Sequence, residues 1–206
     1  MYNNPIIVFE GIEGSGKSHH IKKIANFLKK KKAKFVKIRE PGGSNNSEKI
    51  RRLILNNKSD LDKFSDLLLY FAARNENIEK IIKKNYKKKI ILIDRFTDST
   101  IAYQYYGMGL NKKIIDLINN YFLKKIHVNF TFLNIVSMKN LKKRLNKRKN
   151  LNKYDKFNIN FYNRVQKGFV KVSKNNKKYL IINSNDTIKE NEKIILNKIK
   201  FLTKIK

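Results

Sequence analysis

Residues 11–18 constrain this chain more than any other segment. Their sequence, Gly-Ile-Glu-Gly-Ser-Gly-Lys-Ser, matches the pattern G-x-x-x-x-G-K-[S/T]. The apolar run 6–9 precedes them and a candidate helix follows, so the loop joins a strand to a helix. Glycines let the backbone wrap around phosphate oxygens, and the helix N-terminus adds partial positive charge. We therefore expect the loop to bind the phosphates of ATP through Gly11, Ile12, Glu13, Gly14, Ser15, Gly16, Lys17 and Ser18.

Three side chains near this loop suit phosphate and magnesium. Lys17 would neutralise the β- and γ-phosphates, and the Ser18 hydroxyl would ligate Mg²⁺. Asp94 ends an apolar run, where its carboxylate could hold the same ion or its water. The pattern predicts nucleotide phosphate binding but does not identify an acceptor.

Five short apolar runs predict buried strands, because strands covered on both faces do not alternate apolar and polar residues. They are residues 6–9, 35–38, 90–93, 128–133 and 179–182. Helical stripes separate some of them, such as Phe64, Leu67, Leu68 and Phe71, and a similar pattern recurs at Ile195, Ile199 and Leu202. We predict an α/β fold of the P-loop NTPase type, with a five-stranded parallel sheet flanked by helices on both faces and a small lid. The 206 residues suit a single domain.

The formal charge of +32 allows two interpretations. A nucleic-acid or membrane-surface protein is one, and drift toward AT-rich codons is the other. Drift fits better, since lysine, asparagine and isoleucine are abundant together and arginine is sparse. An arginine that persists in such a sequence suggests a need for a planar, bidentate donor. The apolar run at 6–9 is too short to span a membrane, and cysteine is absent, which excludes disulfides.

Residues 142–157 are rich in Lys, Arg and Asn and poor in apolar residues. This composition predicts a mobile, basic surface element, which we take as the lid. A plain solvated loop is the alternative.

The chain resembles the thymidylate kinases from about residue 6 to residue 169. Beyond the phosphate loop, the resemblance rests on segments in the family's order: Arg39-Glu40-Pro41-Gly42-Gly43, Tyr70-Phe71-Ala72-Ala73-Arg74, Asp94-Arg95-Phe96, Ser99-Thr100-Ile101-Ala102-Tyr103-Gln104, Asn152-Lys153-Tyr154-Asp155 and Phe161-Tyr162-Asn163-Arg164. The segments at 39–43, 94–95 and 99–104 are together specific to that family, whereas the phosphate loop alone is not.

The resemblance assigns roles in binding thymidine monophosphate (dTMP). It implies that Arg95 binds the acceptor phosphate, that Glu13 touches the sugar 3′-hydroxyl or the magnesium shell, and that Tyr103 crowds the 2′ side of the sugar. It also places Tyr70 against the base as a stacking ring and Arg74 near the base. Further candidates are Arg39 as a fork for phosphate, Pro41 after a cis bond, and Thr100 and Gln104 as hydrogen-bonding groups around the base. A core aromatic remains the alternative for Tyr70, and a solvated carboxylate for Glu13.

The lid departs from the family. Relatives with this type of phosphate loop carry Asp-Arg where this chain has Asn152-Lys153. Lysine supplies charge without a fork, so we expect catalytic stabilisation from Lys153, from Arg148, or from both, with Arg148 the larger contributor. His19 and His20 stand where small hydroxyl residues are usual, and we interpret them as drift.

These observations predict an enzyme that phosphorylates dTMP to dTDP with ATP and Mg²⁺, in dTTP synthesis for DNA replication. Lys17, Arg95, Arg148 and Lys153 would be catalytic. The resemblance further implies a homodimer, and we expect a cytoplasmic protein without a membrane or specific nucleic-acid partner. Another nucleoside monophosphate kinase, or a basic nucleic-acid-binding P-loop protein, remains the alternative.

Overall fold

The computed structural model describes residues 4–149 and 151–206. Within them, one sheet of five parallel strands has the order β2-β3-β1-β4-β5. The strands are β1 (Ile6–Glu10), β2 (Phe35–Arg39), β3 (Ile90–Asp94), β4 (Phe130–Ile135) and β5 (Tyr179–Asn183). The five-stranded parallel sheet is as predicted, although the fourth strand begins and ends two residues later than the apolar run at 128–133.

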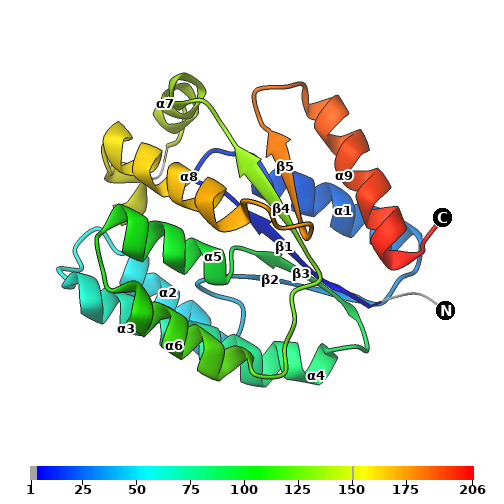
Figure 1. Ribbon diagram of the computed structural model, residues 1–206, viewed down its shortest axis with the longest axis horizontal. Coiled ribbons are helices and arrows are strands. Elements are labelled where there is room, and N and C mark those ends of the chain that lie inside the picture. The colour runs from blue at the N-terminus through cyan, green and yellow to red at the C-terminus, as the bar shows by residue number, and fades with distance from the viewer. Residues whose placement is uncertain (1–3, 150) are drawn as a thin grey trace.

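Helices cover both faces of the sheet (Figure 1). The larger ones are α1 (Lys17–Lys30), α2 (Asn45–Leu55), α3 (Lys63–Asn77), α6 (Lys112–Leu123), α7 (Met138–Asn146), α8 (Ile159–Ser173) and α9 (Ile188–Thr203). Shorter turns are η1 (Ile78–Ile82), α4 (Lys83–Asn85), α5 (Thr97–Thr100), η2 (Ile101–Gly107) and η3 (Lys153–Lys156). None of the described helices is long and apolar enough to cross a membrane.

Alternation along the central strands divides the core into two layers. Ile7 and Phe9 of β1 pack with Ile24 of α1 and Ile195 of α9. Ile6 and Val8 point the other way, into a cluster that includes Ile78 of η1. The carboxyl ends of β1 and β3 therefore meet at one edge of a sheet covered on both sides, where such folds bind ligands.

The helical stripe predicted on α3 is only half buried. Leu67 and Phe71 pack with Ile115 of α6. Phe64 and Leu68, expected to belong to the same buried face, are exposed. Positions i, i+3, i+4 and i+7 cover a sector of the helix surface that includes both the buried face and the edge of that face. Two of the four side chains therefore remain exposed to solvent.

Candidate functional site

The phosphate loop connects β1 to α1, as predicted. Gly11, Gly14 and Gly16 have φ values of 134°, 65° and 88°, a region that side-chain-bearing residues rarely adopt. Gly11 also has no room for a side chain, because a Cβ there would lie 2.2 Å from the carbonyl oxygen of Asn134 on β4. The loop borders a cleft, here called the loop cleft, lined by Glu13, Gly14, Ser15, Gly16, Lys17, Ser18, His19, Arg39, Glu40, Arg51, Asp94, Arg95, Arg148 and Asn152.

Lys17 lies within the curve of the loop. Its Nζ donates to the carbonyl oxygens of Gly11 and Ile12, both at 2.8 Å. Burial and the neighbouring Arg95 guanidinium lower the pKa of Lys17 to about 8. The side chain of Ile12 is buried in the core, so only its backbone can serve the phosphate site.

Ser18 and Asp94 meet at the start of α1. The Ser18 hydroxyl donates to Oδ2 of Asp94 at 3.1 Å. Within residues 4–149 and 151–206, no cluster of three or more His, Cys, Asp or Glu side chains could hold a metal ion. Two hard oxygen donors beside a phosphate loop suit Mg²⁺, which usually takes few protein ligands and completes its shell with phosphate and water.

Arg95 and Glu13 join the end of β3 to the phosphate loop. Arg95 follows the strand directly, with φ of 66°, and its Nη1 donates to the carbonyl oxygen of Gly11 at 2.8 Å. Its Nη2 pairs with Oε1 of Glu13 at 2.8 Å, and the Tyr103 hydroxyl donates to the other oxygen of Glu13. The carboxylate in the phosphate loop is therefore held by two partners and is not a solvated side chain.

Glu10 fixes the backbone beside Arg95, a role that the sequence analysis missed. It accepts hydrogen bonds from the Phe96 amide at 2.7 Å and from the Ser99 amide and hydroxyl at 3.2 and 2.6 Å. Burial and the nearby Asp98 carboxylate raise the pKa of Glu10 to about 7. A carboxylate that ends an apolar strand was the available signal, the same one that identified Asp94.

A second cleft, here called the inner cleft, lies beside the first. It is lined by Glu13, Glu40, Pro41, Arg51, Leu55, Tyr70, Arg74, Arg95, Phe96, Ser99, Thr100, Tyr103, Gln104, Asn152 and Tyr154. Every residue proposed for the acceptor lines it except Arg39. The bond between Glu40 and Pro41 is cis.

Arg74 is fully buried at the wall of the inner cleft. Its Nε pairs with Oε2 of Glu40 at 2.7 Å, Nη1 donates to Oδ1 of Asn119 on α6 at 2.9 Å, and Nη2 donates to the Phe96 carbonyl oxygen at 2.9 Å. Three of its five N–H groups are used in this way, which fixes the plane of the guanidinium. The other two N–H groups make no hydrogen bond to the described residues.

Two further arginines lie at the clefts, Arg39 at the end of β2 and Arg51 on α2. Arg39 lines the loop cleft but not the inner cleft, is about half exposed, and pairs with Glu48 at 3.0 Å. Arg51 lines both clefts, and its Nη1 donates to the Pro41 carbonyl oxygen at 2.6 Å. Burial and the nearby Arg39 lower the pKa of Arg51. Sequence reasoning passed over Arg51, although its survival among so many lysines was a usable signal.

The expected lid is more ordered than its composition predicts. Residues 142–146 continue α7, and Tyr154 and Asp155 of η3 are buried. The expectation of a solvated surface element holds for Lys147 and Lys149 but is wrong for η3, because aromatic packing retains it. Asn150 lies outside the described residues.

Arg148 and Lys153 of the lid are placed differently. Arg148 lines the loop cleft and pairs with Asp155. Lys153 lines neither cleft, and its charge acts on Asp66 of α3. Arg144, which the sequence analysis did not select, donates to the carbonyl oxygens of Gly14 and Ser184, both at 2.7 Å.

The two histidines after Ser18 lie on α1, beside α9. His19 pairs with Glu192 of α9 at 2.7 Å, and His20 is buried between α1 and α9. Both side chains help to pack α1 against α9, so codon drift alone does not account for these two residues.

A phosphate loop between the first strand and first helix of a parallel sheet, with a second cleft against it, defines a P-loop phosphotransferase. Comparison with known proteins specifies the class further. The family model "Thymidylate kinase" matches residues 9–195. A thymidylate kinase of Wolbachia pipientis wMel is 39% identical over 170 residues, which are 81% of this chain and 84% of the relative. One from Mycoplasma capricolum is 37% identical over 203 residues, covering 94% and 95% of the two chains.

A solved structure agrees with these sequences. The crystal structure of thymidylate kinase from Ehrlichia chaffeensis matches with a TM-score of 0.77 and 32% identity, over 96% of this chain and 98% of that one. The chain belongs to the thymidylate kinase family.

Proposed function

We propose that this chain transfers the γ-phosphoryl group of ATP to dTMP, giving dTDP and ADP, as a step toward dTTP for DNA replication. One observation carries the proposal beyond family membership. The loop cleft and the inner cleft share five residues, namely Glu13, Glu40, Arg51, Arg95 and Asn152. Phosphates bound in the two clefts would meet at this shared wall, and in-line transfer requires such proximity.

The catalytic roles follow from position. Lys17 exchanges its contacts with loop carbonyls for the β- and γ-phosphates of ATP. Arg95, held by Glu13 and the Gly11 carbonyl, orients the acceptor phosphate. Arg148 neutralises charge on the transferring group, and Lys153 contributes less because it lines neither cleft.

Magnesium is the metal that the site suits best. Ser18 and Asp94 would hold it, directly or through water, and the bound ion would neutralise phosphate charge. Side chains supply the other interactions at this site. Glu13 holds Arg95 and Tyr103. Asp94 keeps the Ser18 hydroxyl directed toward the loop cleft.

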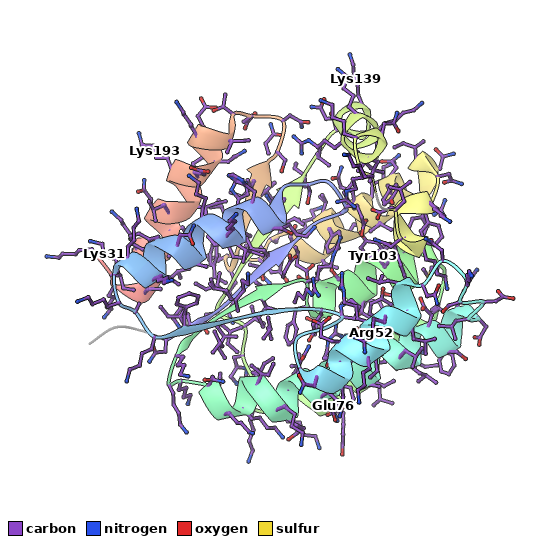
Figure 2. The ribbon with its side chains drawn as sticks, turned by 180° about the vertical axis from the view of Figure 1, so that it is seen from behind. Lys31, Arg52, Glu76, Tyr103, Lys139 and Lys193 are labelled. Carbon is purple, nitrogen blue, oxygen red and sulfur yellow. The ribbon has the colours of Figure 1, made fainter. Side chains whose placement is uncertain are left out.

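The inner cleft accepts the nucleoside. We assign Tyr70 to stacking on the base, Arg74, Thr100 and Gln104 to its polar edge, and Tyr103 to the 2′ side of the sugar. Pro41 forms part of the wall, while Arg39 serves the phosphate side. Figure 2 shows Tyr103 inside the molecule, whereas Lys31, Lys139 and Lys193 project outward.

The active form is proposed to be a homodimer that joins through α3 and α6, which pack together (Figure 1). Their outer faces expose Phe64, Leu68, Ile114, Leu117 and Tyr121. These helices also carry little net charge, with two basic and two acidic residues on α3, and two lysines and one aspartate on α6. By contrast, α1 has five lysines and no acidic residue. Copies of a chain with a charge of +32 would approach most easily through such a surface. Replacement of Leu117 by lysine should shift the sedimentation of the protein toward monomer.

We further propose that residues 1–206 act as one kinase domain with its lid at 142–157, working in the cytoplasm where ATP and nucleoside monophosphates occur. The activity is tested by a coupled ATP assay on dTMP, dUMP, AMP, GMP, CMP and the ribose form of dTMP. dTMP should have the highest specificity constant, in an RNA-free preparation and at raised salt. A higher value for AMP or GMP would overturn the thymidylate assignment but leave a kinase.

A further inference from the structure

Tyr154 belongs to the lid, yet only 4% of it is exposed. Its ring lies edge-on to Tyr70 and Tyr103, with centroid distances of 6.0 Å to each, and it lines the inner cleft. Its hydroxyl donates to Oδ2 of Asp66 on α3. The lid therefore supplies part of the wall against which a nucleobase would rest.

Asp66 depends on this contact. It is 2% exposed, and its Oδ1 has no hydrogen-bond partner among the described residues. Burial raises the pKa of Asp66, which the bond from Tyr154 opposes. A buried carboxyl that loses its partner bears its full desolvation cost, so the Tyr154–Asp66 bond is a strong local constraint on η3.

The next residue along the chain, Asp155, is buried and holds a residue of the other cleft. Asp155 accepts hydrogen bonds from Nη1 of Arg148, from the backbone amide of Asn152 at 3.1 Å and from Nδ2 of Asn152 at 2.6 Å. Arg148 lines the loop cleft. Tyr154 and Asp155 are adjacent in one short helical turn, η3, so a displacement of the first moves the anchor of Arg148.

We propose that Tyr154 is a positioning residue, which couples occupation of the inner cleft by a pyrimidine nucleotide to the placement of Arg148 over the loop cleft. The inference rests on the proposed function. A base that packs against the Tyr154 ring holds that ring against Asp66, and the rigid turn then fixes Asp155 and Arg148. An acceptor that leaves Tyr154 free to move is phosphorylated slowly even when it is bound.

The test is Tyr154→Phe, which keeps the ring and removes the hydroxyl, and with it the bond to Asp66 and the long bond accepted from Nε2 of Gln104 at 3.5 Å. Turnover at saturating ATP and dTMP should fall about tenfold, while the dissociation constant for dTMP, from calorimetry, changes less than about threefold. Tyr106→Phe is the matched control, because the Tyr106 hydroxyl makes no hydrogen bond among the described residues, and its turnover should stay within about twofold of wild type.

Variants of Asp66 test the other side of the Tyr154–Asp66 hydrogen bond. Asp66→Asn retains an oxygen that accepts from Tyr154, so it should keep most of the turnover, whereas Asp66→Ala should lose as much as Tyr154→Phe. The Tyr154→Phe/Asp66→Ala double variant should lose little more than either single variant, because both remove one interaction. Independent, multiplicative losses would overturn the proposal.

Limited trypsin digestion measures how accessible the lid is to the protease. Its basic residues Lys147, Arg148 and Lys149 are exposed. Saturating dTMP should slow cleavage there in the wild type and in Tyr106→Phe, but not in Tyr154→Phe. Equal protection in Tyr154→Phe would overturn the coupling, even if its melting temperature had dropped. If the wild type uses another nucleotide, the proposed function fails, and the same variants then test the coupling with that nucleotide.

Discussion

The floor of the paired clefts and the lid above them are held by different means. Arg95 of the floor is mostly buried and bonds to three partners, Gly11, Glu13 and, at 3.5 Å, Ser99, while its backbone neighbour Phe96 is held by Glu10. Arg148 of the lid has a side chain that is 39% exposed and pairs only with Asp155 among the described residues. The floor is thus fixed before substrates arrive, and the lid relies on a few contacts that a substrate can strengthen or release.

Removing the central cation of the floor should have the largest effect. Lys17→Ala should lower turnover by two to three orders of magnitude, since a preorganised charge on the transferring phosphates is lost. The fold should survive, because Nζ bonds to loop carbonyls and not to a core partner. Circular dichroism and turnover measured on one preparation check both statements. Turnover near that of wild type would contradict the assignment of the phosphate loop.

The buried carboxylate of the floor predicts a pH effect on stability. The pKa of Glu10 is raised to about 7 in the folded protein from an ordinary value of 4.5, so the folded state binds the proton more tightly. Its contribution to stability is complete below pH 4.5 and is lost as the pH rises through 7, by roughly 3 kcal/mol at most.

Denaturant unfolding between pH 5 and pH 8 measures this slope. Glu10→Gln should remove the fall in the free energy of unfolding across that window, whatever its stability at a single pH. Glu76→Gln, at the surface (Figure 2), should leave the slope intact. A wild-type slope that survives in Glu10→Gln would assign the titration to another group, with Asp98 the first to examine.

The lid should respond less strongly than the floor. Arg148→Ala should lower turnover between about tenfold and a hundredfold, because a forked donor at the loop cleft matches charge spread over several phosphate oxygens. Lys153→Ala should lower it less than about threefold, and neither change should alter dTMP affinity much. Steady-state kinetics at fixed ionic strength decide between them. A large loss at Lys153→Ala with none at Arg148→Ala would reverse the two roles.

The same contrast explains how much the sequence could predict. The floor is encoded in short contiguous motifs, so the strand–loop–helix unit and residues such as Asp94, Arg95 and Tyr103 could be assigned to one site. The partners of these residues could not, because Arg74 bonds to Asn119 and Glu10 to Ser99, 45 and 89 positions away. Such pairings depend on how helices pack on the sheet, which no local pattern specifies.

Composition misled most in the lid. Lysine and asparagine predicted a solvated segment, yet two residues within it, Tyr154 and Asp155, are buried. Phe157 and Tyr154 are both aromatic within this basic stretch, and Tyr154 was a usable local signal. Its partner Asp66 lies 88 positions earlier, on α3, and no motif in the sequence identifies Asp66.

Lys153→Arg should produce the smallest effect and is the sharpest test of how the lid works. The resemblance to relatives with an arginine at this position implies that restoring the fork raises turnover. In this structure, however, Lys153 lines neither cleft and its charge acts on Asp66. A longer, forked side chain there would gain little while Arg148 already occupies the loop cleft, so turnover should rise by less than about threefold. Repeating the change in an Arg148→Ala background separates the two donors. If Lys153→Arg restores most of the turnover lost in that background, the lid carries position 153 over the phosphates during catalysis, and the placement of Arg148 as the main donor is wrong.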